Sequence, residues 1–441
     1  MLKKRFFLVM VLSTAAIASG QTDRLTVNAD LLPAPTVEPW SVIRPDTACH
    51  GEWLVAGDVN GDGRAEIITA RNDRQRVTAF AVRDLDGREL WRWGVPGSGR
   101  AQLGYDVPLQ IYDLNGDGRG EVFAGIDRFL LVLDGTGGRE IKRWPLPEGL
   151  NVTDCITFAD LRGLGRPSDI LIKDRYQNVW AYTPDWVLLW HWAPRNYKTC
   201  HHPTPVDIDG DGRDEVLAGY SMLDENGLPL WTLAPEEADL SRGHLDCCEI
   251  FSTGPSPAMH RFVISLCAAK TIAMIDGGGR FLWQQSGEHF ESIDAGRLIR
   301  DTSGKQIAVD LDHRPYGDGL VWILDERGDR QISFRCDYGR HHRLIDWDGD
   351  GVDEILIGNA RALFRGNGSC LVRLGPRDLF ASDAGPQKSG DAGPLAAVGD
   401  LDGDHRPEVI LHSKTRIAVF KGLTSAPRPG PAGTGINFTL Y

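Results

Sequence analysis

The sequence lacks a net positive charge, a zinc-type cysteine spacing and any second long apolar run. With 61 acidic and 48 basic residues, its net charge is −13. Such a chain is a poor partner for nucleic acid, because the phosphate backbone binds basic surfaces. The eight cysteines include no C-x-x-C pair, which argues against the common structural zinc sites. No membrane span is expected downstream of the N-terminal segment.

The N-terminus has the three regions of a secretory signal peptide in the right order. Residues 1–5 carry three basic side chains, residues 6–18 are apolar, and Ala18-Ser19-Gly20 are small. The apolar run is short for a bilayer span, and no lipobox cysteine follows it. We therefore expect a signal peptide at 1–20, an N-terminal extension at 21–39 and a folded domain at 40–441, in a bacterial protein that is secreted or periplasmic.

An acidic turn recurs five times along the chain. It reads DVNGDGRAE from Asp58, DLNGDGRGE from Asp113, DIDGDGRDE from Asp207, DWDGDGVDE from Asp346 and DLDGDHRPE from Asp400. Alternate oxygen side chains around a glycine-permitted turn, closed by a glutamate, are what calcium requires. In the fifth copy His405 replaces a turn glycine, and the turns at Asp160 and near Asp294 have lost most of these oxygens.

Calcium is accordingly the predicted cofactor, at several structural sites and in one further case near the axial site described below. The predicted ligands are the alternate acidic or amide residues and the closing glutamate of each turn: Asp58, Asn60, Asp62, Glu66, Asp113, Asn115, Asp117, Glu121, Asp207, Asp209, Asp211, Glu215, Asp346, Asp348, Asp350, Glu354, Asp400, Asp402, Asp404 and Glu408.

The repeats predict an all-β propeller of eight four-stranded blades, with seven as the alternative. Counting the degenerate copies at Asp160, near Cys248 and near Asp294, the turns start about 49 residues apart, the length of a propeller blade. Short β-branched runs flank each turn, and a D-x-x-G turn precedes a last strand that ends in tryptophan. We expect these tryptophans to pack between blades. The first residues of the mature chain and a last strand at 437–441 are expected to close the ring.

Seven of the twelve histidines lie four to eight residues before these turns. The innermost strands of a propeller run along its axis, so this shared offset predicts a ring of side chains at the axial end opposite the turns. Such a ring of imidazoles and carboxylates favours a binding or catalytic site. The predicted catalytic residues are His202, His244, His289, His342, Tyr105 and Arg343. The predicted substrate-binding residues are His50, Asp106, Asp154, Asp246 and His341.

Residues 201–408 resemble the propeller domain of rhamnogalacturonan lyases, polysaccharide lyase family eleven, and related FG-GAP/VCBS-repeat propeller lyases. The resemblance is carried by HHPTPVDIDGDGRDEVLAGYSMLDENGLPLW from His201, by RGHLDCCEIF from Arg242 and by the three repeats that follow. It implies that His202, His244 and Asp246 belong to a metal-binding or substrate-facing cluster. It also implies a polysaccharide partner, and we expect the protein to act as a monomer.

A lyase mechanism suits these residue types, because β-elimination from a uronate needs carboxylate neutralisation, a base for the C5 proton and an acid for the leaving oxygen. Arg340 and Arg343 are candidates for the neutralising cation. Two alternatives remain open. A glycoside hydrolase would use a carboxylate pair among Asp106, Asp154, Asp246 and Glu291. A non-catalytic, integrin-like adhesion or glycan-binding propeller would use calcium only to stiffen its blades.

Overall fold

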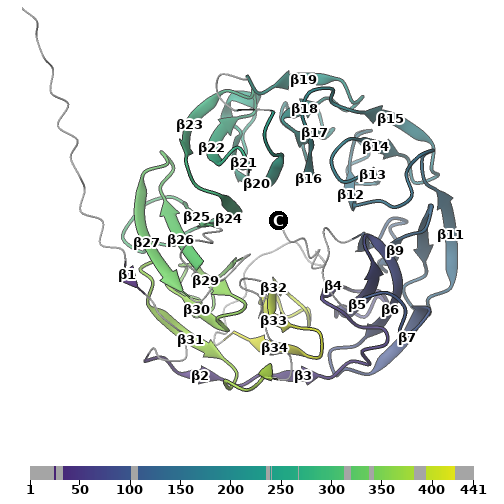
Figure 1. Ribbon diagram of the computed structural model, residues 1–441, viewed down its shortest axis with the longest axis horizontal. Coiled ribbons are helices and arrows are strands. Elements are labelled where there is room, and N and C mark those ends of the chain that lie inside the picture. Colours follow the sequence, from purple (N-terminus) through teal and green to yellow (C-terminus); the bar gives the residue numbers. More distant parts are fainter. Residues whose placement is uncertain are drawn as a thin grey trace, which may run out of the picture.

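The computed structural model is a ring of eight β-sheets around a central axis (Figure 1). It describes residues 24–25, 33–100, 108–234, 239, 241–266, 268–311, 319–336, 342–381 and 394–422. The eight-bladed propeller is confirmed, and the degenerate repeats at Asp160, Cys248 and Asp294 each form a blade. One short 3₁₀ helix, η2 (Pro257–Met259), precedes a strand in the fifth blade. Within the described residues, no helix has the length and hydropathy of a bilayer span.

Each blade has its first strand at the axis, and successive strands lie farther out. Blade 1 contains β4 (Trp53–Gly57), β5 (Glu66–Asp73), β6 (Arg76–Arg83) and β7 (Glu89–Gly94); blade 2 contains β8 (Leu109–Tyr112), β9 (Glu121–Ile126), β10 (Phe129–Leu133) and β11 (Glu140–Pro145); blade 3 contains β12 (Cys155–Ala159), β13 (Asp169–Lys173), β14 (Val179–Tyr182) and β15 (Leu188–Trp192); blade 4 contains β16 (Thr199–Val206), β17 (Glu215–Gly219), β18 (Ser221–Leu223) and β19 (Pro229–Thr232).

The remaining blades follow the same order. Blade 5 contains β20 (Leu245–Ser252), β21 (Arg261–Leu266), β22 (Thr271–Asp276) and β23 (Phe281–Ser286); blade 6 contains β24 (Phe290–Gly296), β25 (Gln306–Leu311), β26 (Gly319–Leu324) and β27 (Arg330–Cys336); blade 7 contains β28 (Arg343–Ile345), β29 (Glu354–Ile357), β30 (Ala362–Phe364) and β31 (Cys370–Leu374); blade 8 contains β32 (Leu395–Gly399), β33 (Glu408–His412) and β34 (Ile417–Lys421).

The N-terminal segment closes the ring from outside. Strand β3 (Ser41–Ile43) pairs antiparallel with β34 and becomes the outermost strand of blade 8. Strands β1 (Arg24–Leu25) and β2 (Thr36–Val37) add parallel edge strands to blades 6 and 7 (Figure 1). The prediction that N-terminal residues close the ring is therefore confirmed, whereas the strand expected at 437–441 and the signal peptide expected at 1–20 lie outside the described residues.

Tryptophans on the outer strands join neighbouring blades, as expected. The indole N–H of Trp190 in blade 3 donates to the Glu225 carbonyl of blade 4 at 3.0 Å, and Trp231 in blade 4 donates to Gly277 of blade 5 at 2.8 Å. The turn glycine Gly227 adopts φ +78° and lies against the Trp190 ring, so a side chain at this position would clash. The D-x-x-G turn and the tryptophan are thus two halves of one contact, and apolar clusters fill the spaces between adjacent blades.

Candidate functional site

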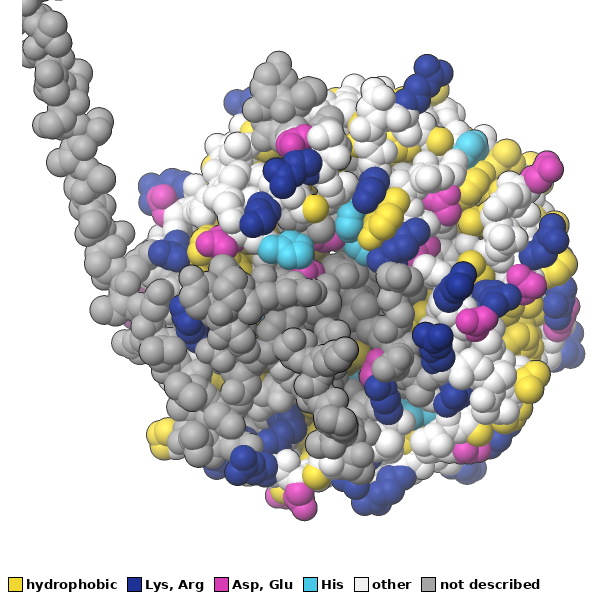
Figure 2. Space-filling view, viewed as in Figure 1, with side chains coloured by type: hydrophobic (Ala, Val, Ile, Leu, Met, Phe, Trp, Pro, Cys, Tyr) yellow, Lys and Arg dark blue, Asp and Glu magenta, His cyan; other side chains and the backbone are white. Residues whose placement is uncertain are grey.

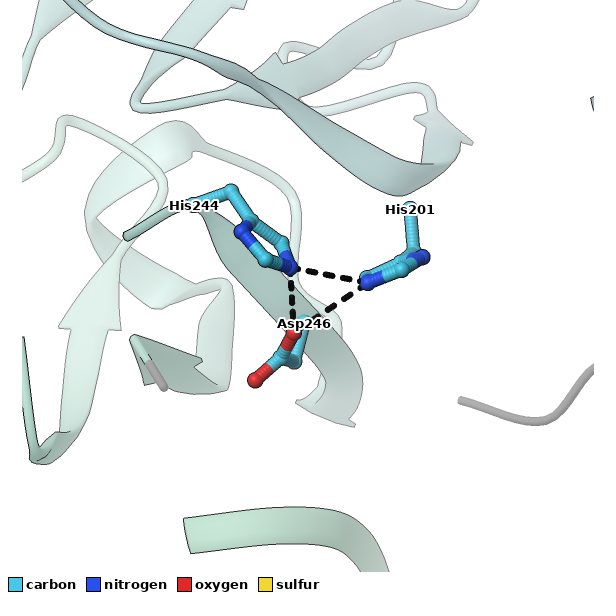
Figure 3. Close-up of side chains that lie close together, drawn as sticks. All are labelled: His201, His244 and Asp246. Atoms are coloured by element: carbon cyan, nitrogen blue, oxygen red, sulfur yellow. Dashed lines mark hydrogen bonds and ion pairs between the residues drawn. The ribbon is translucent and has the colours of Figure 1, made fainter. Parts of the chain in front are cut away.

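Two histidines and one aspartate from blades 4 and 5 converge at the axis. His201 lies on β16, Asp246 on β20, and His244 just before β20 (Figure 3). The Nε2 atoms of His201 and His244 lie 2.8 Å apart, and Asp246 Oδ1 lies 2.7 Å from His244 Nε2 and 3.3 Å from His201 Nε2. All three residues are buried. Three donor atoms around one point can share protons or hold one cation.

Burial and hydrogen bonding shift the pKa values of this cluster in opposite directions. Burial alone would raise the pKa of Asp246, but hydrogen bonds from His201 and His244 outweigh it and bring the pKa to about 2. Burial lowers the pKa of His244, although Asp246 acts the other way. Near neutral pH, Asp246 is therefore ionised and His244 can accept a proton or bind a metal through a neutral ring.

The donor set fits a metal ion. His201, His244 and Asp246 each aim one ligand atom at the same point. Two imidazole nitrogens with one carboxylate suit a transition metal such as Zn²⁺ better than calcium, which prefers oxygen ligands. Calcium at the axial site stays a prediction. The donor set of two imidazoles and one carboxylate suits a softer ion better.

Tyr176 extends the cluster toward the surface. It lies in the turn between β13 and β14, and its hydroxyl is 3.3 Å from His244 Nε2 and 3.4 Å from His201 Nε2. The Arg175 guanidinium carbon lies 4.8 Å from the centre of the Tyr176 ring, and Lys198 Nζ lies 5.0 Å from it. A phenol flanked by two cations therefore borders the imidazole pair.

Asp154 has a structural position rather than the substrate-binding one predicted. Its carboxylate accepts a hydrogen bond from Lys173 Nζ at 3.0 Å and lies 3.5 Å from Arg175 Nη1. The side chains of Asp154 and Lys173 are 2% and 0% exposed, so a glycan does not reach them. Asp154 instead orients Arg175.

The structure places His201 in the cluster, and not the predicted His202. His201 faces the cluster, whereas His202 Nδ1 lies 3.1 Å from Cys155 Sγ. The pairing of β16 with β17 shifts register between Thr199 and Thr204. Strict alternation fails across such a bulge, so the sequence could not tell which histidine faces the axis.

Several other predicted residues lie elsewhere around the axis. His50 is fully buried and bonds the Ser413 carbonyl at 2.7 Å, which does not fit a substrate contact. His289 is partly exposed, 3.6 Å from the buried Glu291. Residues Tyr105, Asp106 and His341 lie outside the described residues.

His342 belongs to a second cluster, on blades 6 and 7. It is fully buried, with Nε2 3.4 Å from Asp294 Oδ2 and Nδ1 3.4 Å from the Ser292 hydroxyl. Arg343 donates to the His342 carbonyl. Burial raises the pKa of Asp294 to about 6 despite the nearby cations.

The acidic turns show the geometry expected of a cation loop. In the first turn, Asp58 accepts N–H groups of Gly61 and Gly63, and Glu66 accepts that of Val59. Carboxylate oxygens gather in three turns, around Asp207, Asp346 and Asp400. Among described residues, the buried Oδ1 atoms of Asp348 and Asp402 have no hydrogen-bond partner.

The electrostatics of the turns also fit a cation. Burial raises the pKa of Glu354 to about 8, and those of Glu66, Glu215 and Glu408 to about 7, with neighbouring aspartates adding to the rise. The mutual repulsion of crowded, partly buried carboxylates of this kind is relieved by a bound cation.

Six of the described cysteines form no disulfide, including the adjacent Cys247 and Cys248.

Sequence reasoning missed Arg175, Tyr176 and Lys198, although a signal was available. In a blade, the hairpin between strands two and three returns to the same end as the start of strand one. The connection from one blade to the next also lies at this end. Arg175 and Tyr176 lie in such a hairpin and Lys198 in such a connection. These loops therefore lie at the axial end although they are not within the inner-strand offset from the acidic turns.

The chain is similar to two rhamnogalacturonan lyases of Bacillus subtilis strain 168. It is 22% identical to the exolyase YesX over 504 aligned residues, 93% of this chain and 78% of that protein. It is 24% identical to the endolyase YesW over 446 residues, 84% of this chain and 67% of that protein. No family model matches the chain.

Solved structures give the same fold. The crystal structure of the exotype lyase YesX superimposes with a TM-score of 0.64 at 19% identity, covering 86% of this chain and 72% of that one. The Vibrio cholerae biofilm matrix protein Bap1 superimposes with a TM-score of 0.55 at 16% identity, covering 88% and 91%. The predicted resemblance to the propeller of rhamnogalacturonan lyases is thereby confirmed.

Proposed function

We propose that this protein is a polysaccharide lyase that cleaves a uronate-containing, rhamnogalacturonan-like glycan by β-elimination. The observation that carries the proposal is the convergence of His201, His244 and Asp246 with Tyr176 at the axis. The similarity to two lyases over most of the chain supports it. Because the substrate is a polymer, the protein would act outside the cytoplasm.

In this mechanism, the neutral imidazole of His244 or the Tyr176 oxygen removes the C5 proton of the uronate, and the other group protonates the leaving oxygen at C4. Asp246 stays ionised, fixes both rings and stabilises their charged forms. A cation held by His201, His244 and Asp246 would supply further positive charge near the sugar, and the Tyr176 oxygen would then be the base because His244 Nε2 would be a ligand. Burial of the cluster strengthens each of these interactions.

The test is to incubate the protein with rhamnogalacturonan and follow the ultraviolet band of the C4=C5 double bond. Replacing His201 or His244 by Ala should lower the rate by about 100-fold or more, whereas His202→Ala is the matched control, because that neighbour faces Cys155. Equal rates for the H201A and H202A variants would disprove the assignment. Shortened polymer without the double bond would indicate hydrolysis instead.

A glycoside hydrolase remains the second candidate because two inner strands carry carboxyl groups with raised pKa. Burial raises the pKa of Glu249 on β20 to about 7 and that of Asp294 on β24 to about 6. A carboxyl that stays protonated near neutral pH can act as general acid in glycoside hydrolysis. If hydrolysis products appear, Glu249→Gln should abolish them.

We also propose that the acidic turns bind calcium, with the alternate Asp or Asn side chains and the closing Glu as ligands. The convergence of carboxylates in three turns supports this, as do the buried oxygens of Asp348 and Asp402. These ions would stiffen the end of the ring opposite His201.

A further inference from the structure

Lys and Arg side chains gather beside histidine near the centre of one face of an otherwise acidic protein (Figure 2). The contacts of Arg175 and Lys198 place these two cations at the axial site. Arg175 and Lys198 approach the ring of Tyr176 at 4.8 and 5.0 Å. The Arg175 side chain is 26% exposed and Lys198 is exposed, so both can meet a ligand.

Two described carboxylates near these cations have other hydrogen-bond donors. Asp154 already has a fully buried counter-ion in Lys173. The Asp174 carboxylate accepts hydrogen bonds from the backbone of its own turn, at Gln177 and Asn178. Arg175 and Lys198 thus place two cations against the one phenol ring that borders the imidazoles.

The position of Arg175 is fixed before any ligand arrives. Its guanidinium is held by Asp154 at 3.5 Å, and Lys173 donates to both the Asp154 carboxylate and the Arg175 carbonyl at 3.0 Å. A buried brace of this kind lowers the entropy lost when Arg175 binds an anion. Guanidinium groups suit planar carboxylates because they can donate two parallel hydrogen bonds.

We propose that Arg175 and Lys198, which both approach the Tyr176 ring, form the subsite that binds the carboxylate of an acidic sugar. The Tyr176 hydroxyl bridges this subsite to His201 and His244, 3.4 and 3.3 Å away. A uronate carboxylate on these cations would therefore bring its ring next to the imidazoles. The inference rests on the proposed function for the identity of the glycan, but carboxylate binding is testable without cleavage.

The experiment compares two sugars that differ only at C6: methyl α-galacturonoside and methyl α-galactoside. Neither has a glycosidic bond at C4, so neither can be eliminated during an NMR titration. The wild-type protein should bind the acid at least about tenfold more tightly, the effect of one charge-assisted hydrogen bond. Arg175→Gln and Lys198→Gln should each bring that ratio close to one and leave affinity for the neutral sugar unchanged.

Two controls separate charge from general damage. Arg175→Lys keeps the charge and should retain part of the ratio. Arg143→Gln, on the outer strand β11 with Glu140 as its partner, should keep the full ratio. A wild-type ratio of one, no binding of either sugar, or equal losses for both sugars would overturn the proposal.

The outcome is distinguishable from failure of the proposed function. If the acid is preferred but no double bond forms in the polymer, the lyase assignment fails and the carboxylate subsite stands. If the polymer is cleaved equally well by wild type and by both the R175Q and K198Q variants, the lyase stands and the subsite fails.

Discussion

The two ends of this propeller are built in opposite ways. At one end, near-identical turns repeat from blade to blade, and the same bonds recur, such as that from the backbone of Val59 to Glu66 and from Ile208 to Glu215. At the axial end the polar clusters differ: His201, His244 and Asp246 lie on blades 4 and 5, whereas His342 and Asp294 lie on blades 6 and 7. The repeated turns form the structural scaffold, and the residues at the axial end differ between blades and form the candidate site.

This difference has an energetic side. Backbone hydrogen bonds join neighbouring turns, such as that from the Gly120 N–H to the Asp58 carbonyl at 2.8 Å, but the turn aspartates themselves are at least partly exposed to solvent. A cluster at the axial end buries charged side chains together, such as Asp154 with Lys173. Removing one member of a buried ion pair leaves the other charge unpaired, which costs more than losing an exposed contact. The predictions below test that contrast.

The largest effect is expected from Asp154→Ala, because it leaves Lys173 as a buried charge without its carboxylate. We expect a loss of about 3–5 kcal/mol in the free energy of unfolding, measured by urea denaturation. Asp185→Ala, an exposed aspartate in the same blade, is the control and should change it by less than about 0.5 kcal/mol. Similar urea midpoints for both variants would contradict the expected cost of breaking the buried ion pair.

The loss of calcium from one turn should have an intermediate effect. Each occupied turn adds stability by mass action, about 2.7 kcal/mol when free calcium is 100 times the dissociation constant. A chelator should therefore lower the melting temperature, and Asp348→Ala should lower the calcium content by one ion per chain in a metal analysis. Asp185→Ala again serves as control. An unchanged melting temperature with chelator would show that these turns are purely hydrogen-bonded.

The regular end was the more predictable one. Periodic turns favoured eight blades over seven, and the recurring tryptophans predicted inter-blade packing such as that of Trp190, because both follow from local sequence. At the axial end, His244 and Asp246 were identified from their shared offset, but the bulge in β16 exchanged His202 for His201. Such a bulge depends on packing that a single sequence does not encode locally.

The smallest expected effect concerns His412, a buried histidine that ends β33 near His50. Burial, with a smaller contribution from the charge of His50, lowers the pKa of His412 to about 3. Its neutral form thus stabilises the fold fully above the unfolded pKa of about 6.5. That stability is lost as pH falls, by up to about 1.4 kcal/mol per pH unit.

Replacing His412 by Gln should therefore flatten the dependence of unfolding free energy on pH between about 6 and 4, whatever the variant does to absolute stability. His191→Gln, at an exposed position on β15, should keep the wild-type slope. If the H412Q variant keeps that slope as well, His412 is protonated in the folded protein. In that case the axial end would hold a titrating histidine away from the His201 cluster. Titration of a histidine would then not distinguish the candidate site from the structural part of the axial end.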